Sequence, residues 1–167
     1  MKDNFIQLNK DHILRLGIRT VDGKETGEHL EFDLEDIELP LKYQELIEQE
    51  KKNRTNFKNQ ITIIERRQDV KGKKLMSKNE EDKIKALTEF YKKEAEILDG
   101  FLGEGGVNKL LNGRKLGWTS LQEIDEIITN QIAPHIKINT DDIIKKVREK
   151  YKVSEEAEVL EWNILSM

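Results

Sequence analysis

The sequence predicts a mainly α-helical fold that opens with a β-hairpin, which is an α+β arrangement. Three observations lead to this prediction. Apolar and polar residues alternate in two short runs near the N-terminus, and apolar residues recur at helical spacing through most of the later chain. Only two prolines occur in 167 residues, of which 37% are charged. We therefore expect a long antiparallel helix pair followed by a compact C-terminal helical part.

The N-terminal region, residues 1–38, is predicted to contain the hairpin. Residues 12–21 and 29–34 each alternate with period two, which is typical of a half-buried strand, and Asp22-Gly23 between them is a turn signal. Because two strands alone are only marginally stable in water, their apolar face must lie on a helix or on another chain. The residues on that face are Leu14, Leu16, Ile18, Leu30, Phe32 and Leu34.

Residues 39–152 are predicted to form a helical domain with a long charged helical arm. Pro40 suits the first turn of a helix that extends to about residue 69. No large apolar residue occurs between Glu48 and Asn56, so we expect the ends of this helix to be buried and its middle to project into solvent.

The second helix of the arm is predicted over residues 79–102. Ser77 and Glu80 form a capping box at its start, and apolar residues follow at helical spacing. A helix that follows a short basic connection in this way should return antiparallel to the first helix.

The chain turns within residues 97–113, which contain three glycines between positions 103 and 106. A nucleotide loop is disfavoured there, because no Gly-Lys-Ser/Thr follows and the preceding segment is helical. A helix end is the expected structure. Apolar residues around the turn are predicted to belong mostly to the core, and some of them to a groove for a partner helix. This partner-binding hypothesis covers Phe101, Leu102, Val107, Leu110, Leu111 and Trp118.

The C-terminal part is predicted to contain two helices. Trp118 precedes a capping box formed by Thr119 and Gln122, and an isoleucine-rich helix follows in which Pro134 should cause a kink or an early end. Residues 139–142 should cap the last helix. Residues 153–167 form an acidic tail that we expect to be flexible or to dock on another surface.

Charge is distributed unevenly along the chain although the net charge is only −4. Residues 28–50 contain nine acidic residues and one lysine, whereas residues 51–78 contain ten basic residues and two acidic ones. Opposite blocks of this kind can guide association, and homo-oligomer formation is therefore a hypothesis. The residues assigned to self-association are Glu45, Glu48, Glu50, Lys51, Lys52, Arg54, Arg66 and Arg67. The alternative is that these charges only keep an exposed helix solvated.

Few residues suggest chemistry. The chain has no cysteine, and its three histidines make a weak case for zinc, so we predict no metal site, no cofactor and no catalytic residues. No apolar run approaches the roughly 20 residues of a membrane span, and no signal-peptide pattern begins the chain, which favours a cytoplasmic protein without membrane partners. The basic segment 51–78 could bind nucleic acid. However, it has few aromatic residues and the whole protein is acidic, so the sequence disfavours nucleic acid as a partner.

The order of these elements resembles the tail assembly chaperones of long-tailed phages and prophages of Gram-positive bacteria. The resemblance covers residues 12–151 and depends on three features. These are the alternating hairpin, the sequence Phe-Asp-Leu-Glu-Asp-Ile-Glu-Leu-Pro before a charged helix, and a second helix that ends in the glycine segment and is followed by Leu110-Leu111-Asn112-Gly113 and an isoleucine-rich helix.

The resemblance implies a function without catalysis. Such proteins bind the long helical tape-measure protein, keep it soluble and assist polymerisation of tail-tube subunits around it. They act in the cytoplasm of the host bacterium and are absent or scarce in the mature virion. The expected partners are therefore a tape-measure protein and a tail-tube protein. The alternatives are a structural protein of the virion, for tail or head completion, and a nucleic-acid-binding regulator that uses residues 51–78.

Overall fold

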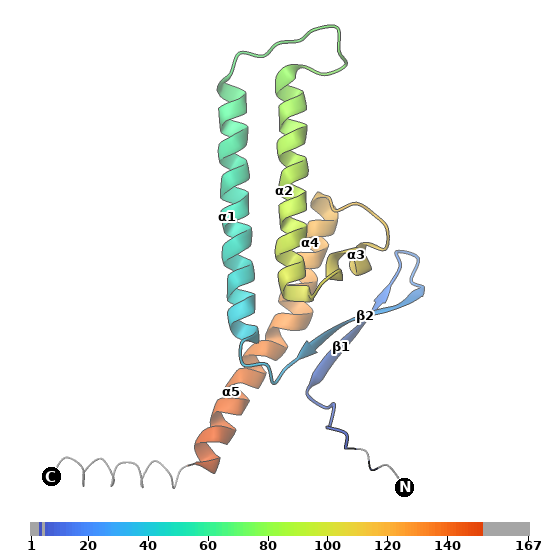
Figure 1. Cartoon of the computed structure of the whole chain (residues 1–167), viewed down its shortest axis with the longest axis vertical. Helices are drawn as coiled ribbons and strands as arrows, with labels where there is room; N and C mark the ends of the chain where they lie inside the picture. Colours follow the sequence, from blue (N-terminus) through green and yellow to red (C-terminus); the bar gives the residue numbers. More distant parts are fainter. Residues whose placement is uncertain (1–3, 5, 152–167) are drawn as a thin grey trace, which may run out of the picture.

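The computed structural model describes residue 4 and residues 6–151, except for the side chains of residues 137–140. Two long antiparallel helices form an arm, and a hairpin, a short helix and a C-terminal helical rod surround its base (Figure 1). The predicted α+β class is confirmed, and the predicted tail, residues 153–167, lies outside the described residues. The elements are β1 (Ile13–Arg19), β2 (Glu25–Asp33), α1 (Leu39–Arg66), α2 (Lys78–Leu102), α3 (Gly106–Leu111), α4 (Trp118–Ile127), η1 (Ile128–Ile132) and α5 (Ala133–Lys150).

The predicted hairpin with one apolar face is present. β1 and β2 are antiparallel, and Leu14 faces Phe32 while Leu16 faces Leu30, so the apolar residues share one side. That side packs on helices, as a marginal two-stranded sheet requires: the rings of Phe32 and Phe101 of α2 lie 5.5 Å apart. β2 begins earlier than predicted, at Glu25, and the register shifts between Gly17 and Arg19.

The arm consists of α1 and α2, which are continuous helices of 28 and 25 residues. The capping box predicted for α2 is confirmed. The Ser77 hydroxyl accepts a hydrogen bond from the Glu80 amide at 3.2 Å, and a Glu80 carboxylate oxygen accepts one from the Ser77 amide at 3.1 Å. The far halves of both helices extend beyond the rest of the molecule, and the basic connection joins them at the tip (Figure 1).

The prediction that the middle of α1 projects into solvent is only partly correct: most of residues 48–56 are exposed, but one side of this stretch packs against α2 and α4. Asn53 donates a hydrogen bond to Glu94 of α2 at 2.9 Å, and Arg54 donates one to Asp125 of α4 at 3.1 Å. This stretch of α1 has no apolar stripe because the residues of α2 and α4 that it contacts are also polar. The part that projects is the far end of the arm.

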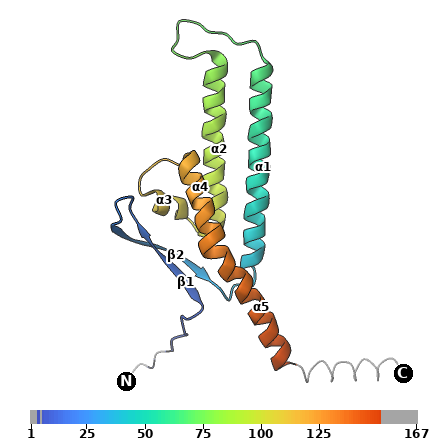
Figure 2. The same cartoon turned by 180° about the vertical axis from the view of Figure 1, so that it is seen from behind.

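α4, η1 and α5 form one helical rod that crosses the lower half of the arm (Figure 2). Pro134 neither ends nor shortens this rod. The π-helical turn η1 precedes it, and the Ala133 amide donates a hydrogen bond to the Ile128 carbonyl. Pro134 occupies the first turn of α5, where the lack of an amide hydrogen costs little. The cap predicted at residues 139–142 was therefore wrong, because the backbone there continues α5.

The start of α4 also differs from the prediction. Gly117 is its N-cap, and Trp118 is already helical. Ser120, rather than Gln122, completes the cap, since its hydroxyl accepts a hydrogen bond from the Gly117 amide at 2.9 Å.

One contiguous core joins the hairpin to the helices. Phe101 lies between β2 and α1, because its ring is close to that of Phe32 and 5.8 Å from that of Tyr43. Leu98 of α2 and Ile132 of η1 are fully buried. The other buried apolar residues of this cluster are Ile18, Leu30, Leu39, Leu46, Phe90, Leu102, Val107, Leu111, Leu121, Ile124, Ile128 and Ile136.

Candidate functional site

The glycine segment is a helix end, as predicted. Gly103 and Gly105 both have positive φ, at 99° and 74°, which lets the backbone reverse after α2. The Asp99 carboxylate accepts a hydrogen bond from the Val107 amide at 2.9 Å and so fixes the start of α3. The segment thereby holds α3 against α2 and the hairpin.

Two glycines near this turn should respond to alanine in opposite ways. A Cβ at Gly106 would lie 2.7 Å from the Leu102 Cβ, whereas a Cβ at Gly100, inside α2, would meet nothing within 4 Å. We expect Gly106→Ala to destabilise the fold by at least about 1 kcal/mol through overpacking. Gly100→Ala should stabilise it by about 0.5–1 kcal/mol, because alanine favours the helix. Urea unfolding of both variants measures these changes, and equal effects of the same sign would contradict the close approach at Gly106.

The structure divides the six predicted partner-binding residues into two groups. Phe101, Leu102, Val107 and Leu111 are buried in the core, so their apolar groups are occupied by this chain itself. Leu110 is half-buried, and Trp118 is 64% exposed at the first turn of α4. Only these last two side chains are accessible to another molecule without rearrangement.

A groove lies between the hairpin and α3–α4. Leu110 is part of its lining, whereas Trp118 is not. The groove has a volume of about 350 Å³. Its apolar lining comes from three elements, with Ile18 on β1, Leu110 on α3 and Ile127 on α4. Its polar lining includes Arg114, Glu123 and Gln131. We call it the hairpin groove, and an apolar hollow with polar groups at its edge suits the apolar face of a helix.

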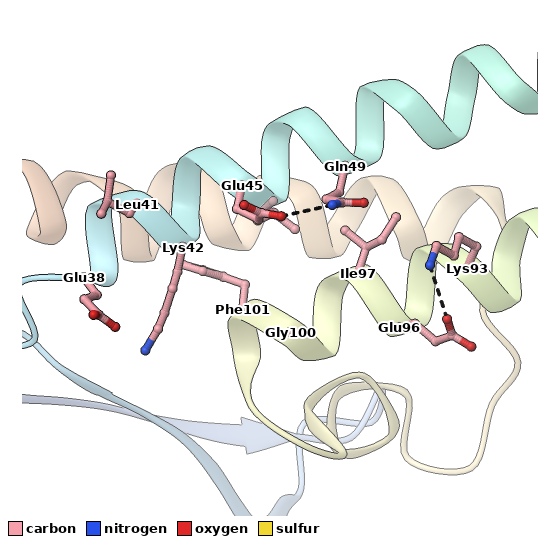
Figure 3. Close-up of a pocket in the computed structure, with 11 residues that line it drawn as sticks. Glu38, Leu41, Lys42, Glu45, Gln49, Lys93, Glu96, Ile97, Gly100 and Phe101 are labelled. Carbon is pink, nitrogen blue, oxygen red and sulfur yellow. Dashed lines mark hydrogen bonds and ion pairs between the residues drawn. The ribbon is translucent and has the colours of Figure 1, made fainter.

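A second groove lies at the base of the arm, on the face shown in Figure 3, and we call it the arm groove. It has a volume of about 550 Å³. Leu41 of α1 and Ile97 of α2 supply apolar surface, and Gly100 leaves the floor open because it has no side chain. The two lysines of the groove are already paired, Lys42 with Asp36 at 2.9 Å and Lys93 with Glu96 at 3.6 Å.

A cluster of carboxyl groups joins α1, α2 and α4 at the middle of the arm. Glu94 is completely buried, and its Oε2 has no hydrogen-bond partner in the described part of the chain. Burial raises the pKa of Glu94, against the hydrogen bond from Asn53. Burial also raises the pKa of Glu50 to about 8, and the negative charge of Asp125 adds to this effect, whereas Arg54 opposes it. Glu50 is therefore largely protonated at neutral pH.

The eight residues assigned to self-association have different environments. Glu50 and Arg54 belong to the carboxyl cluster, and Arg67 is bonded to Asp82 at 2.8 Å, so these three interact within the chain. The other five are exposed on α1, where acids lie toward the base and bases toward the tip: Glu45, Glu48, Lys51, Lys52 and Arg66. The acidic segment therefore reaches the base of the arm, and the basic segment extends toward its tip.

The histidines lie beside acids of the hairpin. His12 is 3.6 Å from Asp33, and His29 is 3.1 Å from Glu31. Within the described residues, no group of three or more histidine, aspartate or glutamate side chains is arranged to hold a metal ion. No helix in that part of the chain is long and apolar enough to cross a bilayer.

Several residues of these sites were missed by sequence reasoning. Glu94 and Asp125 carried no signal, because each is an ordinary acid in an amphipathic helix until the helices meet. Leu41 and Ile63 did carry one: both are large apolar residues away from the buried stripe of α1, and they are 64% and 63% exposed.

Comparisons with known proteins identify no relative of this chain. No family model matches the sequence, and neither a curated protein nor a solved structure is similar to it at a significant level.

Proposed function

We propose that this protein is a phage tail assembly chaperone that binds the tape-measure protein and assists polymerisation of the tail tube. The observation that carries the proposal is the hairpin groove, with Leu110 in its wall and Trp118 exposed at the nearby start of α4. The resemblance in element order described above supports the same function. In this proposal the protein is not an enzyme and has no cofactor.

The groove fits a helical client. Its walls are a strand and two helices anchored in the core, so the apolar surface is formed before the client arrives. An amphipathic client helix would place its apolar side chains between Ile18 and Ile127, and its polar side chains near Arg114 and Glu123. Covering that apolar face would keep an extended tape-measure helix from aggregating.

Two substitutions at the hairpin groove and at the start of α4 should reduce capture of the client. Leu110→Asp and Trp118→Ala should each weaken binding of a co-expressed tape-measure protein by about tenfold or more, because each removes an apolar contact worth at least about 1.4 kcal/mol. The measurement is affinity capture of the tape-measure protein, quantified against a dilution series. Tyr151→Ala is the matched control, since it removes another exposed aromatic side chain, at the end of α5.

Two outcomes separate the alternatives. Unchanged capture by both variants, with folding intact, would remove the hairpin groove from the proposal. Failure of the parent protein to capture the tape-measure protein would remove the chaperone function itself. We expect the protein in the host bacterial cytoplasm, and mass spectrometry of purified particles should find it absent or scarce. A fixed copy number there would instead favour a structural protein of the virion.

Nucleic-acid binding is the second candidate, and one observation favours it. Residues 51–78, which contain ten basic residues, extend from the middle of the arm to its tip, away from the hairpin (Figure 1). Several basic residues of the arm are nevertheless neutralised within the chain, as in the ion pairs Arg67–Asp82, Lys74–Glu81 and Lys83–Glu65. A duplex-binding assay at increasing salt would show a steep loss of affinity if the tip binds phosphates.

A further inference from the structure

The arm has complementary ends. Among the described residues, Glu38 and Glu45 at the base have no cation within salt-bridge distance, and the same holds at the far end for Arg66, which has no carboxylate partner. Other exposed charges of α1, such as Glu48, Lys52 and Lys58, also form no salt bridge among the described residues, so the unpaired charge of this helix is acidic toward the base and basic toward the tip. A second copy placed antiparallel would bring the acidic end of one arm beside the basic end of the other.

The same face of the arm carries exposed apolar groups at both ends. Leu41 lies in the arm groove, and Ile63 lies near the tip with 63% of its surface exposed. They are 22 positions apart, about six helical turns, so they lie on the same side of α1 at a separation of roughly 33 Å. Ile63 is exposed and does not belong to the core cluster, so its side chain is free to enter a groove on another molecule.

These positions are mutually consistent in one antiparallel register. If two copies of α1 are placed side by side so that Leu41 faces Ile63 of the other copy, Glu38 faces Arg66 as well, because both pairs are centred on Lys52. The arrangement is two-fold symmetric, so each contact occurs twice. Lys52 meets its own copy at the centre, where its long side chain can direct the ammonium group into solvent.

We propose that the arm docks antiparallel on the arm of a second copy of this chain, with Ile63 of each copy in the arm groove of the other. The groove is open for this contact because Gly100 has no side chain and nothing lies within 4 Å of the position of its missing Cβ. The arm groove continues along the same face into a hollow of about 440 Å³ between α1 and α2. Its lining combines polar residues, such as Gln49 and Lys52, with the rings of Phe57 and Phe90. That hollow would receive the middle of the partner's α1. This dimer does not depend on the function proposed above.

Sedimentation analysis of the full chain tests the interface. The parent protein should dimerise at low ionic strength and dissociate as salt is raised, because the terminal contacts are ionic. Ile63→Glu should raise the dimer dissociation constant by at least about tenfold, since it places a charge in an apolar groove. Ile144→Glu is the control: it makes the same change at an exposed isoleucine of α5, outside the arm, and should leave the dimer intact. A monomeric parent protein, or an Ile63→Glu variant that remains dimeric, would overturn the proposal.

Charge reversal and cross-linking test the register. Arg66→Glu should weaken the dimer, and the double variant Glu38→Arg with Arg66→Glu should restore it, because both copies then carry the reversed pair. The chain has no cysteine, so a single introduced one reports on geometry. Lys52→Cys should form a disulfide-linked dimer on oxidation. Lys58→Cys should not, because it would lie far from its own copy. Absence of rescue, or equal cross-linking of both cysteine variants, would refute this register.

Discussion

Replacing Phe101 by alanine is expected to destabilise the fold by about 3–5 kcal/mol, the usual range for a buried aromatic residue. The ring is 6% exposed and lies against Phe32 of the hairpin and Tyr43 of α1. Its removal would leave a cavity where three elements meet. Because a two-stranded hairpin depends on packing for its stability, the hairpin should detach first.

The matched variant is Trp118→Ala, which removes a larger aromatic side chain that is mostly in water. It should change stability by no more than about 0.5 kcal/mol. Thermal and urea unfolding of both variants, with hydrogen exchange of β1 and β2 amides, provide the measurement. A Phe101 variant as stable as the Trp118 variant would mean that the core around the glycine turn is not closed, and would return Phe101 to the candidate partner-binding residues.

The second large effect is the pH dependence of stability, which Glu50→Gln should reduce. The pKa of Glu50 is raised from 4.5 to about 8 in the folded chain, so between these values the folded state binds a proton that the unfolded state has released. The free energy of unfolding should therefore fall as pH rises from about 4.5 to about 8 and level off above that. Glutamine keeps the shape of the side chain and does not ionise. At about pH 8.5 the variant should be more stable than the parent by on the order of 2 kcal/mol. An effect of this size is expected because the Glu50 side chain is only 12% exposed, so solvent screens its charge little.

Glu48→Gln is the control for this experiment, because Glu48 is on the same helix but exposed. It should keep the parent's pH profile. Urea midpoints of the three proteins, measured from acidic to mildly alkaline pH, provide the comparison. The residual slope of the Glu50 variant should have the same sign as that of the parent, because burial also raises the pKa of Glu94. A parent protein whose stability is constant or rises between pH 5 and pH 8 would show that the carboxyl cluster is not desolvated.

Local patterns in the sequence were sufficient for the hairpin and for most helices. The alternation of Leu14 and Leu16 with polar residues fixes which side of β1 is buried, since side chains on a strand alternate. Ser77 and Glu80 mark the start of α2 because the capping box uses contacts three residues apart. The glycines after Phe101 indicate the end of α2 because they adopt positive φ.

The failures occurred where the deciding partner is distant in sequence. The polar middle of α1 has the sequence pattern of an exposed helix. Its partners, Glu94 of α2 and Asp125 of α4, lie 41 and 71 residues further along the chain. Pro134 suggested a kink or an early end of the helix. The rod does change direction between α4 and α5 (Figure 2), but the π-helical turn η1 shifts the hydrogen bonds so that the chain remains helical.

The candidate sites show the same division. Residue types are enough to establish that the chain carries opposite charge blocks and a dense apolar segment, because charge and hydrophobicity are properties of each residue. Tertiary structure alone decided that Phe101 is core while Trp118 is exposed, that a groove lies between the hairpin and α4, and that the charge blocks are opposite ends of one arm. Burial depends on which surfaces meet after folding, and these surfaces come from segments that are far apart along the chain.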